Sequence, residues 1–120
     1  MSPLRCPDCD LPLEGRACVV AGRAGSLSGC TCGGAWFTWL QLEQVLGGEV
    51  ALEPLSAQTA RRCPTCTLSL TPVLLPGVIP VETCSACRGV WLDWPDVLDL
   101  RLPGLEAVLQ PAPAQRYAGL

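Results

Sequence analysis

Histidine and lysine are both missing from this 120-residue chain, and the absence of histidine in particular narrows what it can do. Without histidine, neither a Ser-His-Asp triad nor a Cys-His pair can form. The sequence also has no glycine-rich phosphate loop after a strand and no recognisable pair of catalytic carboxylates. We therefore expect a protein that is not an enzyme.

Positive charge is scarce as well, because all eight basic residues are arginines and they are outnumbered by eleven acidic residues. The formal net charge is −3 at pH 7. Affinity for nucleic acid comes chiefly from Lys and Arg side chains that neutralise phosphates. The composition therefore disfavours a general nucleic-acid binder, while leaving room for a local arginine contact.

Long apolar runs suited to a membrane are also lacking. Residues 63–81 carry no charge, but they contain four prolines. A lipid-exposed helix would need about 20 predominantly apolar residues, and proline breaks helices. The N-terminus shows no basic-then-apolar signal segment. We expect no membrane partner and a cytoplasmic location.

Cysteine, by contrast, is abundant, and eight of the nine form two copies of one pattern. Each copy has a Cys-Pro-x-Cys pair, a spacer of 20 or 17 residues, a second close cysteine pair and then a tryptophan. Close pairs at this separation are typical of four-thiolate zinc sites. The expected ligands are Cys6, Cys9, Cys30 and Cys32 for the first site and Cys63, Cys66, Cys84 and Cys87 for the second.

Two structural zinc ions per chain explain this pattern better than disulfides, because the cysteines are paired closely and their number is odd. Four protein ligands leave no open coordination position, which disfavours Lewis-acid catalysis. Iron is the less suitable metal. A rubredoxin-like iron site favours glycine directly after each Cys-x-x-Cys turn, or knuckle, whereas here Asp10 and Thr67 occupy those positions. Each zinc-thiolate centre adds −2, so the loaded chain should carry about −7.

The first site departs from the pattern, because Cys30-Thr31-Cys32 is one residue short of a full knuckle. Two alternatives therefore stay open: Cys18 replaces Cys30 as a ligand, or the site is degraded. Cys18 itself falls on an expected strand, where a small buried hydrophobic role is the plain interpretation. As a resolving thiol it would instead make the first site a redox switch.

The two copies divide the chain into modules near 40 residues, a size that usually needs a metal or disulfide staple. We expect a first zinc ribbon with its helix at 1–46, a connector at 47–62 that holds at most a brief helical turn, a second ribbon with its helix at 63–101, and a C-terminal turn and loose tail at 102–120.

Within each module we expect a β-hairpin and then a short helix. The hairpin arms are residues 14–20 and 26–28, with a five-residue loop, and residues 69–75 and 78–82, joined by Pro76-Gly77. Thr38 and Asp93 are suited to cap the helices, Gly47-Gly48 and Pro103-Gly104 to stop them, and residues 105–110 to add one turn. Gly34 and Gly89 are expected to supply positive φ.

Apolar residues at helical spacing offer a way to dock the modules. These are Leu42, Val45 and Leu46 in the first helix and Val97 and Leu100 in the second. Trp36 and Trp91 are expected in the core, and Trp39 and Trp94 at the contact between modules or in an exposed patch for a partner. Arg61-Arg62 is expected to be a solvated pair, with contact to an acidic partner or a phosphate as the alternative.

The order Cys-Pro-x-Cys, hairpin, Cys-x-x-Cys-x-Gly-x-Trp-Leu-Asp and short helix resembles the bacterial zinc-finger family related to the zinc ribbon of transcription factor IIB. Residues 84–93 match the second half of that pattern position by position. The resemblance covers both repeats and implies a cytoplasmic zinc ribbon, with Cys63, Cys66, Cys84 and Cys87 as ligands. The first repeat departs at Thr38, where the family usually has an acid.

Together these observations predict a small metal-stabilised α+β fold, in which two tandem zinc ribbons, each followed by a short helix, pack as a pseudo-symmetric pair. We expect a non-catalytic zinc-binding protein that acts as a protein-interaction module, with another protein as its partner. An accessory role in transcription or translation rests on fold kinship alone. The alternatives are a redox or zinc-sensing switch that uses Cys18 and the Cys30/Cys32 knuckle, and a nucleic-acid-binding ribbon.

Overall fold

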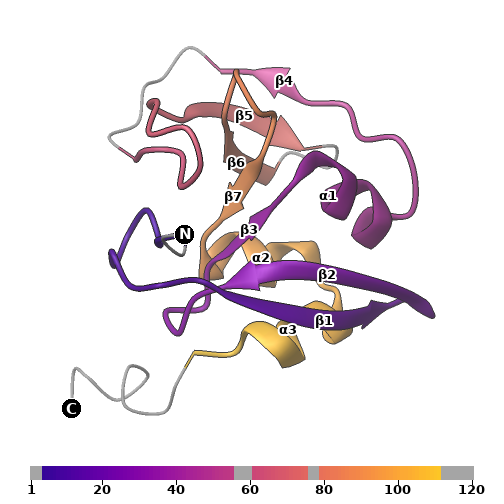
Figure 1. The fold of residues 1–120 in the computed structure, drawn as a ribbon. Helices are drawn as coiled ribbons and strands as arrows, with labels where there is room; N and C mark the ends of the chain where they lie inside the picture. Colours follow the sequence, from indigo (N-terminus) through magenta and orange to yellow (C-terminus); the bar gives the residue numbers. More distant parts are fainter. Residues whose placement is uncertain (1–3, 56–60, 76–78, 112–120) are drawn as a thin grey trace.

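A computed structural model describes residues 4–55, 61–75 and 79–111, which form an antiparallel sheet and short helices (Figure 1). The strand order is β1-β2-β3-β7-β6-β5-β4, so β1 to β3 of the first repeat lie side by side, followed by β7, β6 and β5 of the second repeat and by β4 of the connector at the edge. The small α+β class expected from the sequence is therefore present. Within the described residues, no helix has the length and apolar character to span a membrane.

The first hairpin joins β1 (Glu14–Val20) to β2 (Arg23–Gly29). Its turn consists of Ala21 and Gly22, which have φ values of 51° and 79°. Two central residues with positive φ are the mark of the type I′ turn, whose twist matches that of the flanking strands. The predicted five-residue loop is therefore wrong, because β2 continues through residues 23–25 up to this tight turn.

The second hairpin pairs β5 (Thr71–Leu75) with β6 (Ile79–Thr83). Both strands begin later than predicted, and the proposed turn at Pro76-Gly77 lies outside the described residues. The connector contributes β4 (Glu53–Pro54), which pairs with β5 at the edge of the sheet. The brief helical turn expected there is absent from the described part of the connector, and a proline at an edge strand is well tolerated.

The two repeats meet through β3 (Ala35–Phe37) and β7 (Val90–Leu92), which pair in the middle of the sheet. Trp36 lies opposite Trp91 in this register, and all six residues of the two strands are buried. Figure 1 shows this central pair with one hairpin on each side. Docking through the helical faces was predicted, and the structure adds to it a pairing of two three-residue strands, which forms the junction.

Each junction strand leads directly into a helix, α1 (Trp39–Leu46) after β3 and α2 (Trp94–Leu100) after β7. Thr38 and Asp93 cap these helices, each in a reciprocal capping box with the residue three positions later. Gly47 ends α1 in the left-handed conformation, as expected for a glycine after a helix. The predicted starts of both helices and the end of α1 agree with the structure.

The end of α2 differs from the prediction, because Arg101 rather than Pro103-Gly104 closes it, with φ of 54°. Pro103 and Gly104 instead begin α3 (Pro103–Leu109), where proline is favoured in the first turn. Gly104 also brings α3 close to β1, since an added Cβ would lie 1.8 Å from the Val19 carbonyl oxygen. The single turn expected at 105–110 is therefore part of a seven-residue helix.

Apolar residues from both repeats form one large core. Leu42 and Val45 from α1 belong to the same cluster as Val97 from α2, and Leu46 and Leu100 pack against it. Because the helical stripes contribute to this common core, the two halves of the described chain form one packed unit. A second, smaller apolar cluster contains cysteines from both predicted metal sites.

Candidate metal centres

The first centre gathers Cys6, Cys9, Cys30 and Cys32, whose sulfur atoms all lie within 4.8 Å of one another. The Cys6 sulfur accepts hydrogen bonds from the backbone N–H groups of Asp8 and Cys9, at 3.3 Å each. Such bonds stabilise a thiolate within a knuckle turn. The Cys6 and Cys32 sulfurs are 3.8 Å apart.

The second centre has the same construction and gathers Cys63, Cys66, Cys84 and Cys87 within the same limit of 4.8 Å. Here Thr65 and Cys66 donate their N–H groups to the Cys63 sulfur, at 3.3 and 3.2 Å. The Cys63 and Cys87 sulfurs are 3.6 Å apart. Cys87 is the exposed member of this group, whereas no ligand of the first centre is exposed.

Both arrangements fit a tetrahedral zinc ion. A Zn–S distance of about 2.3 Å implies sulfur–sulfur separations of roughly 3.8 Å, close to those found at both centres. All nine cysteines are free thiols, so none of the eight ligands is taken up by a disulfide. Each group of four can therefore hold one zinc ion, which supplies the positive charge that four adjacent thiolates need.

Without a metal, close packing opposes ionisation of several of these thiols. The hydrogen bond with Cys32, followed by burial, raises the pKa of Cys6 above its ordinary value. Burial is the main cause that raises the pKa of Cys9 to about 11 and that of Cys63 to about 12. Zinc binding must therefore displace protons from these groups, so the metal and the folded knuckles depend on each other.

The shortened knuckle of the first site is accommodated within its turn. Gly33 N–H bonds to the carbonyl of Cys30, whereas in the longer knuckle Arg88 N–H bonds to the carbonyl of Cys84 one residue further back. Both Gly33 and Arg88 have positive φ, at 94° and 63°. The missing residue thus shortens the turn without removing Cys30 from the metal group.

Cys18 does not join either metal group. It lies on β1 in the large core, 4% exposed, beside Gly25 and Val45. Burial raises the pKa of its thiol, which keeps it in the neutral form. The structure thus places Cys18 as a small buried hydrophobic residue, and Cys30 remains with the other ligands of the first site.

Gly34 and Gly89 have a different role from the one predicted. Neither is among the described residues with positive φ. A Cβ on Gly34 would lie 2.4 Å from the Trp91 ring, and one on Gly89 would lie 2.1 Å from the Trp36 ring. Each tryptophan therefore packs on the glycine of the other repeat, and both rings belong to the cluster that contains cysteines of both sites.

Trp39 and Trp94 also contact the opposite repeat, as one of the two hypotheses from the sequence proposed. The guanidinium of Arg88 lies over the Trp39 ring, 4.3 Å from its centroid. An added Cβ on Gly33 would lie 2.9 Å from Trp94 Cβ. The second knuckle of each repeat thus packs against the first helical residue of the other.

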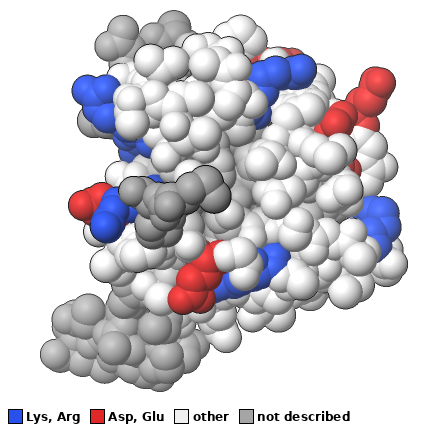
Figure 2. Space-filling model, in the orientation of Figure 1, with Lys and Arg blue, Asp and Glu red and all other residues white. Residues whose placement is uncertain are grey.

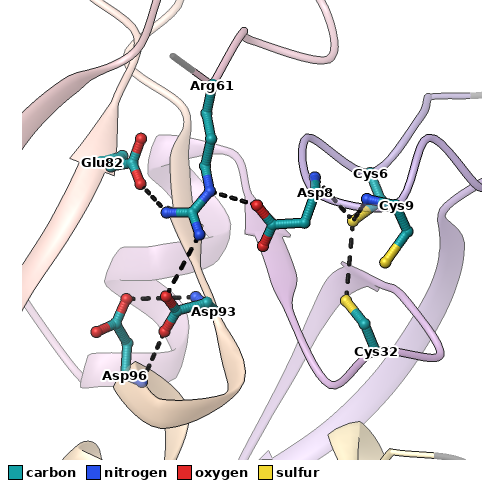
Figure 3. A network of polar contacts seen from close by, with 8 residues as sticks. All are labelled: Cys6, Asp8, Cys9, Cys32, Arg61, Glu82, Asp93 and Asp96. Carbon is teal, nitrogen blue, oxygen red and sulfur yellow. Dashed lines mark hydrogen bonds and ion pairs between the residues drawn. The ribbon is translucent and has the colours of Figure 1, made fainter. Parts of the chain in front are cut away.

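Arg61 was expected to be solvated or to contact an acidic partner or a phosphate, and neither hypothesis placed its partners within the chain. Its guanidinium forms ion pairs with Asp8, Glu82 and Asp93 (Figure 3). Burial alone would lower the pKa of Arg61, but its hydrogen bonds to Asp8 and Glu82 raise it above the ordinary value. No local pattern indicates this role, because Asp8 precedes Arg61 by 53 residues.

Charge is sparse and mixed on the face of the molecule that Figure 2 shows. Figure 2 shows isolated basic and acidic side chains of the described residues on a largely uncharged face, and no continuous basic stripe is visible there. Arg62 and Arg5 each donate to a backbone carbonyl near a knuckle, of Thr67 and Asp10 respectively. These arginines therefore support the knuckle turns.

Comparison with known proteins identifies one part of the chain. Residues 62–100 match the family model described as transcription factor zinc-finger, a zinc ribbon of the transcription factor IIB type. No curated protein and no solved structure matches the chain. The match covers about a third of the sequence and includes all four cysteines of the second centre. The second repeat therefore matches the transcription factor IIB-type zinc ribbon family, and the first repeat adds a second four-cysteine group.

Proposed function

We propose that this chain is a non-catalytic, cytoplasmic protein-interaction module in which two zinc ribbons pack as a pseudo-symmetric pair. Support for the paired arrangement comes from the opposed strands β3 and β7 and from the reciprocal contacts of Trp36 with Gly89 and Trp91 with Gly34. Support for a structural metal comes from the two complete sets of four thiols. Zinc bound by four cysteines stabilises a fold and lacks an open position for substrate.

The observation that carries the interaction role is a pair of exposed leucines at equivalent positions. Leu11 and Leu68 each follow the first knuckle of their repeat by one residue, after Asp10 and Thr67. They are 46% and 48% exposed. In both repeats the leucine carbonyl accepts the N–H of the first knuckle cysteine, at 2.8 Å, so the backbone beneath each side chain is held by the knuckle.

Exposed apolar side chains on a hydrogen-bonded backbone are suited to contact another protein. Neither leucine belongs to the core clusters, so replacing them should leave the fold and the metal content unchanged. An accessory role beside the transcription or translation machinery is the finer form of this proposal, and the family match to a transcription factor zinc-finger favours it.

Affinity capture with the zinc-loaded chain tests the proposal. We expect a defined set of proteins to be retained by the unchanged chain and lost from a Leu11→Ser/Leu68→Ser variant. Leu40→Ser is the matched control, because Leu40 is 65% exposed but lies on α1 away from the knuckle turns. If all three chains retained the same proteins equally, the proposal that Leu11 and Leu68 contact a partner would be contradicted.

The other two functions gain less support. A redox switch that uses Cys18 lacks geometric support, because Cys18 lies in the large core and not in the apolar cluster that contains the ligands. For a nucleic-acid-binding ribbon, the acidic composition remains the main opposing observation. A gel shift repeated at several salt concentrations tests that function, since phosphate contacts give binding that weakens steeply with salt.

A further inference from the structure

Arg61 occupies a position between the two metal centres. Its Nη1 atom pairs with Glu82 on β6, and its Nη2 atom lies 3.6 Å from Asp93, the residue that caps α2. Its Nε atom pairs with Asp8, inside the first knuckle. Figure 3 shows the guanidinium pointing between the acids of the second repeat and the knuckle of the first.

One end of this contact is tied to the second ribbon. Arg61 precedes the ligand Cys63 by two residues, and its carbonyl accepts the N–H of Leu70 at 2.9 Å. Glu82 is 9% exposed, and its other carboxylate oxygen is buried with no hydrogen-bond partner among the described residues. A buried carboxylate in this condition strongly favours a nearby positive charge. The second ribbon therefore holds the Arg61 side chain in place.

The other end is tied to the metal group of the first ribbon. Asp8 lies between Cys6 and Cys9, and its own N–H donates to the Cys6 sulfur at 3.3 Å. The position of the Asp8 carboxylate therefore depends on whether the first knuckle is closed around its ligands. An arginine already held by the second ribbon favours the closed form of this turn.

The first repeat offers no equivalent of this arrangement. Aligned on the knuckles, Leu4 stands where the second repeat has Arg61, and Thr65 stands where the first has Asp8. The Asp8–Arg61 contact therefore has no counterpart with the roles of the two repeats exchanged. It connects the repeats in addition to the apolar junction of β3 and β7.

We propose that the Asp8–Arg61 ion pair couples the two zinc sites, so that zinc in the second ribbon increases retention of zinc in the first. Coupling between two binding sites is reciprocal, so zinc in the first site also favours the second by the same factor. Because Asp8 and Arg61 are each 31% exposed at the side chain, solvent weakens the pair. We expect a coupling factor near the lower end of the usual range, about fivefold.

The test uses the full-length, zinc-loaded chain and a chelator titration followed by NMR. Backbone amides of Cys9 and Gly34 report the first site, and those of Cys66 and Gly89 report the second. We expect Asp8→Asn to release zinc from the first site at about fivefold lower chelator concentration. Asp10→Asn is the matched control, because it removes the same charge from the same turn but not an Arg61 partner, and Asn tolerates positive φ.

A double-mutant cycle with Cys87→Ser measures the coupling itself. Opening the second site by Cys87→Ser should weaken retention at the first site more when Asp8 is present than in the D8N background. An equal factor in both backgrounds would overturn the proposal, as would identical behaviour of Asp8→Asn and Asp10→Asn.

Arg61→Ala supplies the complementary measurement, with Arg62→Ala as its control. Within the described residues, the Arg62 side chain donates to the Thr67 carbonyl of its own knuckle, so its removal should leave the first site unchanged. Arg61→Ala should add little to Asp8→Asn at the first site, because Asp8 is the Arg61 partner in the first knuckle, whereas Glu82 and Asp93 belong to the second repeat. Additive effects would overturn the coupling. These outcomes are independent of whether Leu11 and Leu68 contact a partner.

Discussion

The two repeats of this chain solve the same structural problem with different local chemistry. Both close a four-cysteine group, begin a helix with a capping box after the tryptophan strand, and place a glycine under the tryptophan of the other repeat. They differ in knuckle length, in the hairpin and in charge, since Glu82 and Asp93 occur only in the second repeat, with no acid at the equivalent positions in the first. The two repeats therefore share the features that the metal groups and the β3–β7 junction require, and they differ in the length and sequence of their turns.

Both repeats contribute equally to the β3–β7 junction, so separating the repeats should have the largest effect on folding. We expect residues 1–50 and 60–120, expressed as separate chains, to fail to reach their native folds. Each alone would expose a strand, β3 or β7, whose three residues are all buried in the whole chain. Amide spectra with zinc present check this expectation. If the two pieces fold independently and do not bind each other when mixed, the inference that the repeats form one packed unit is wrong.

Cys18 lies in the core and Cys87 in a metal group, so replacing each by serine should affect zinc content and stability very differently. Cys87→Ser should lose zinc from the second site, whose binding in such modules amounts to about 10–16 kcal/mol and is coupled to folding. Cys18→Ser should keep both zinc ions and lose only about 1–3 kcal/mol, because it places a hydroxyl in an apolar core. Metal analysis and denaturant unfolding measure both effects. Equal losses in the two variants would mean that Cys18 is a ligand.

Substitutions at Gly34 and Gly89 test whether the glycine–tryptophan contacts are equivalent in the two repeats. Gly34→Ala and Gly89→Ala should each cost about 1–3 kcal/mol of unfolding free energy, since the new methyl group overlaps an indole ring that is fully buried. Gly15→Ala is the control, because nothing lies within 4 Å of its added Cβ. Denaturant unfolding of the three variants provides the comparison. Similar stability of Gly34→Ala and Gly15→Ala would show that the ring can move aside.

Asp96 and its counterpart Gln41 give the smallest expected difference between the repeats. Burial, followed by repulsion from Asp93, raises the pKa of Asp96 to about 7. A folded pKa above the unfolded value of about 3.9 means that this group stabilises the fold fully below pH ~4 and loses that contribution as pH rises through 7. Because Asp96 is partly exposed, we expect a change of about 1 kcal/mol.

Asp96→Asn should remove this pH dependence while keeping an oxygen that accepts from the Asp93 N–H. Unfolding free energies at several pH values between 5 and 8, compared with those of the unchanged chain, measure the effect. An identical pH dependence in the two proteins would show that another group causes it.

Local patterns in the sequence predicted much of this fold correctly. Thr38, Asp93 and Gly47 lie at the helix ends expected for them, because capping depends on residues only three or four positions away. The first hairpin strand, Glu14–Val20, has the predicted bounds. Pro103-Gly104 was misassigned because proline suits the start of a helix as well as the region after one, and only packing against β1 distinguishes the two.

The sequence by itself determined the ligands of the second site, since spacing along the chain decides which thiols can reach a common ion. For the first site it predicted the same arrangement, and the structure decided in favour of Cys30 over Cys18. Tertiary structure decided how the two groups are connected. The strands of the junction have three residues each, too few for a periodic signal, and they pair across 55 positions of sequence. The space required at Gly34 and the charge partner of Arg61 depend on equally distant residues. Interactions between residues far apart in the chain become visible only once the backbone has brought them together.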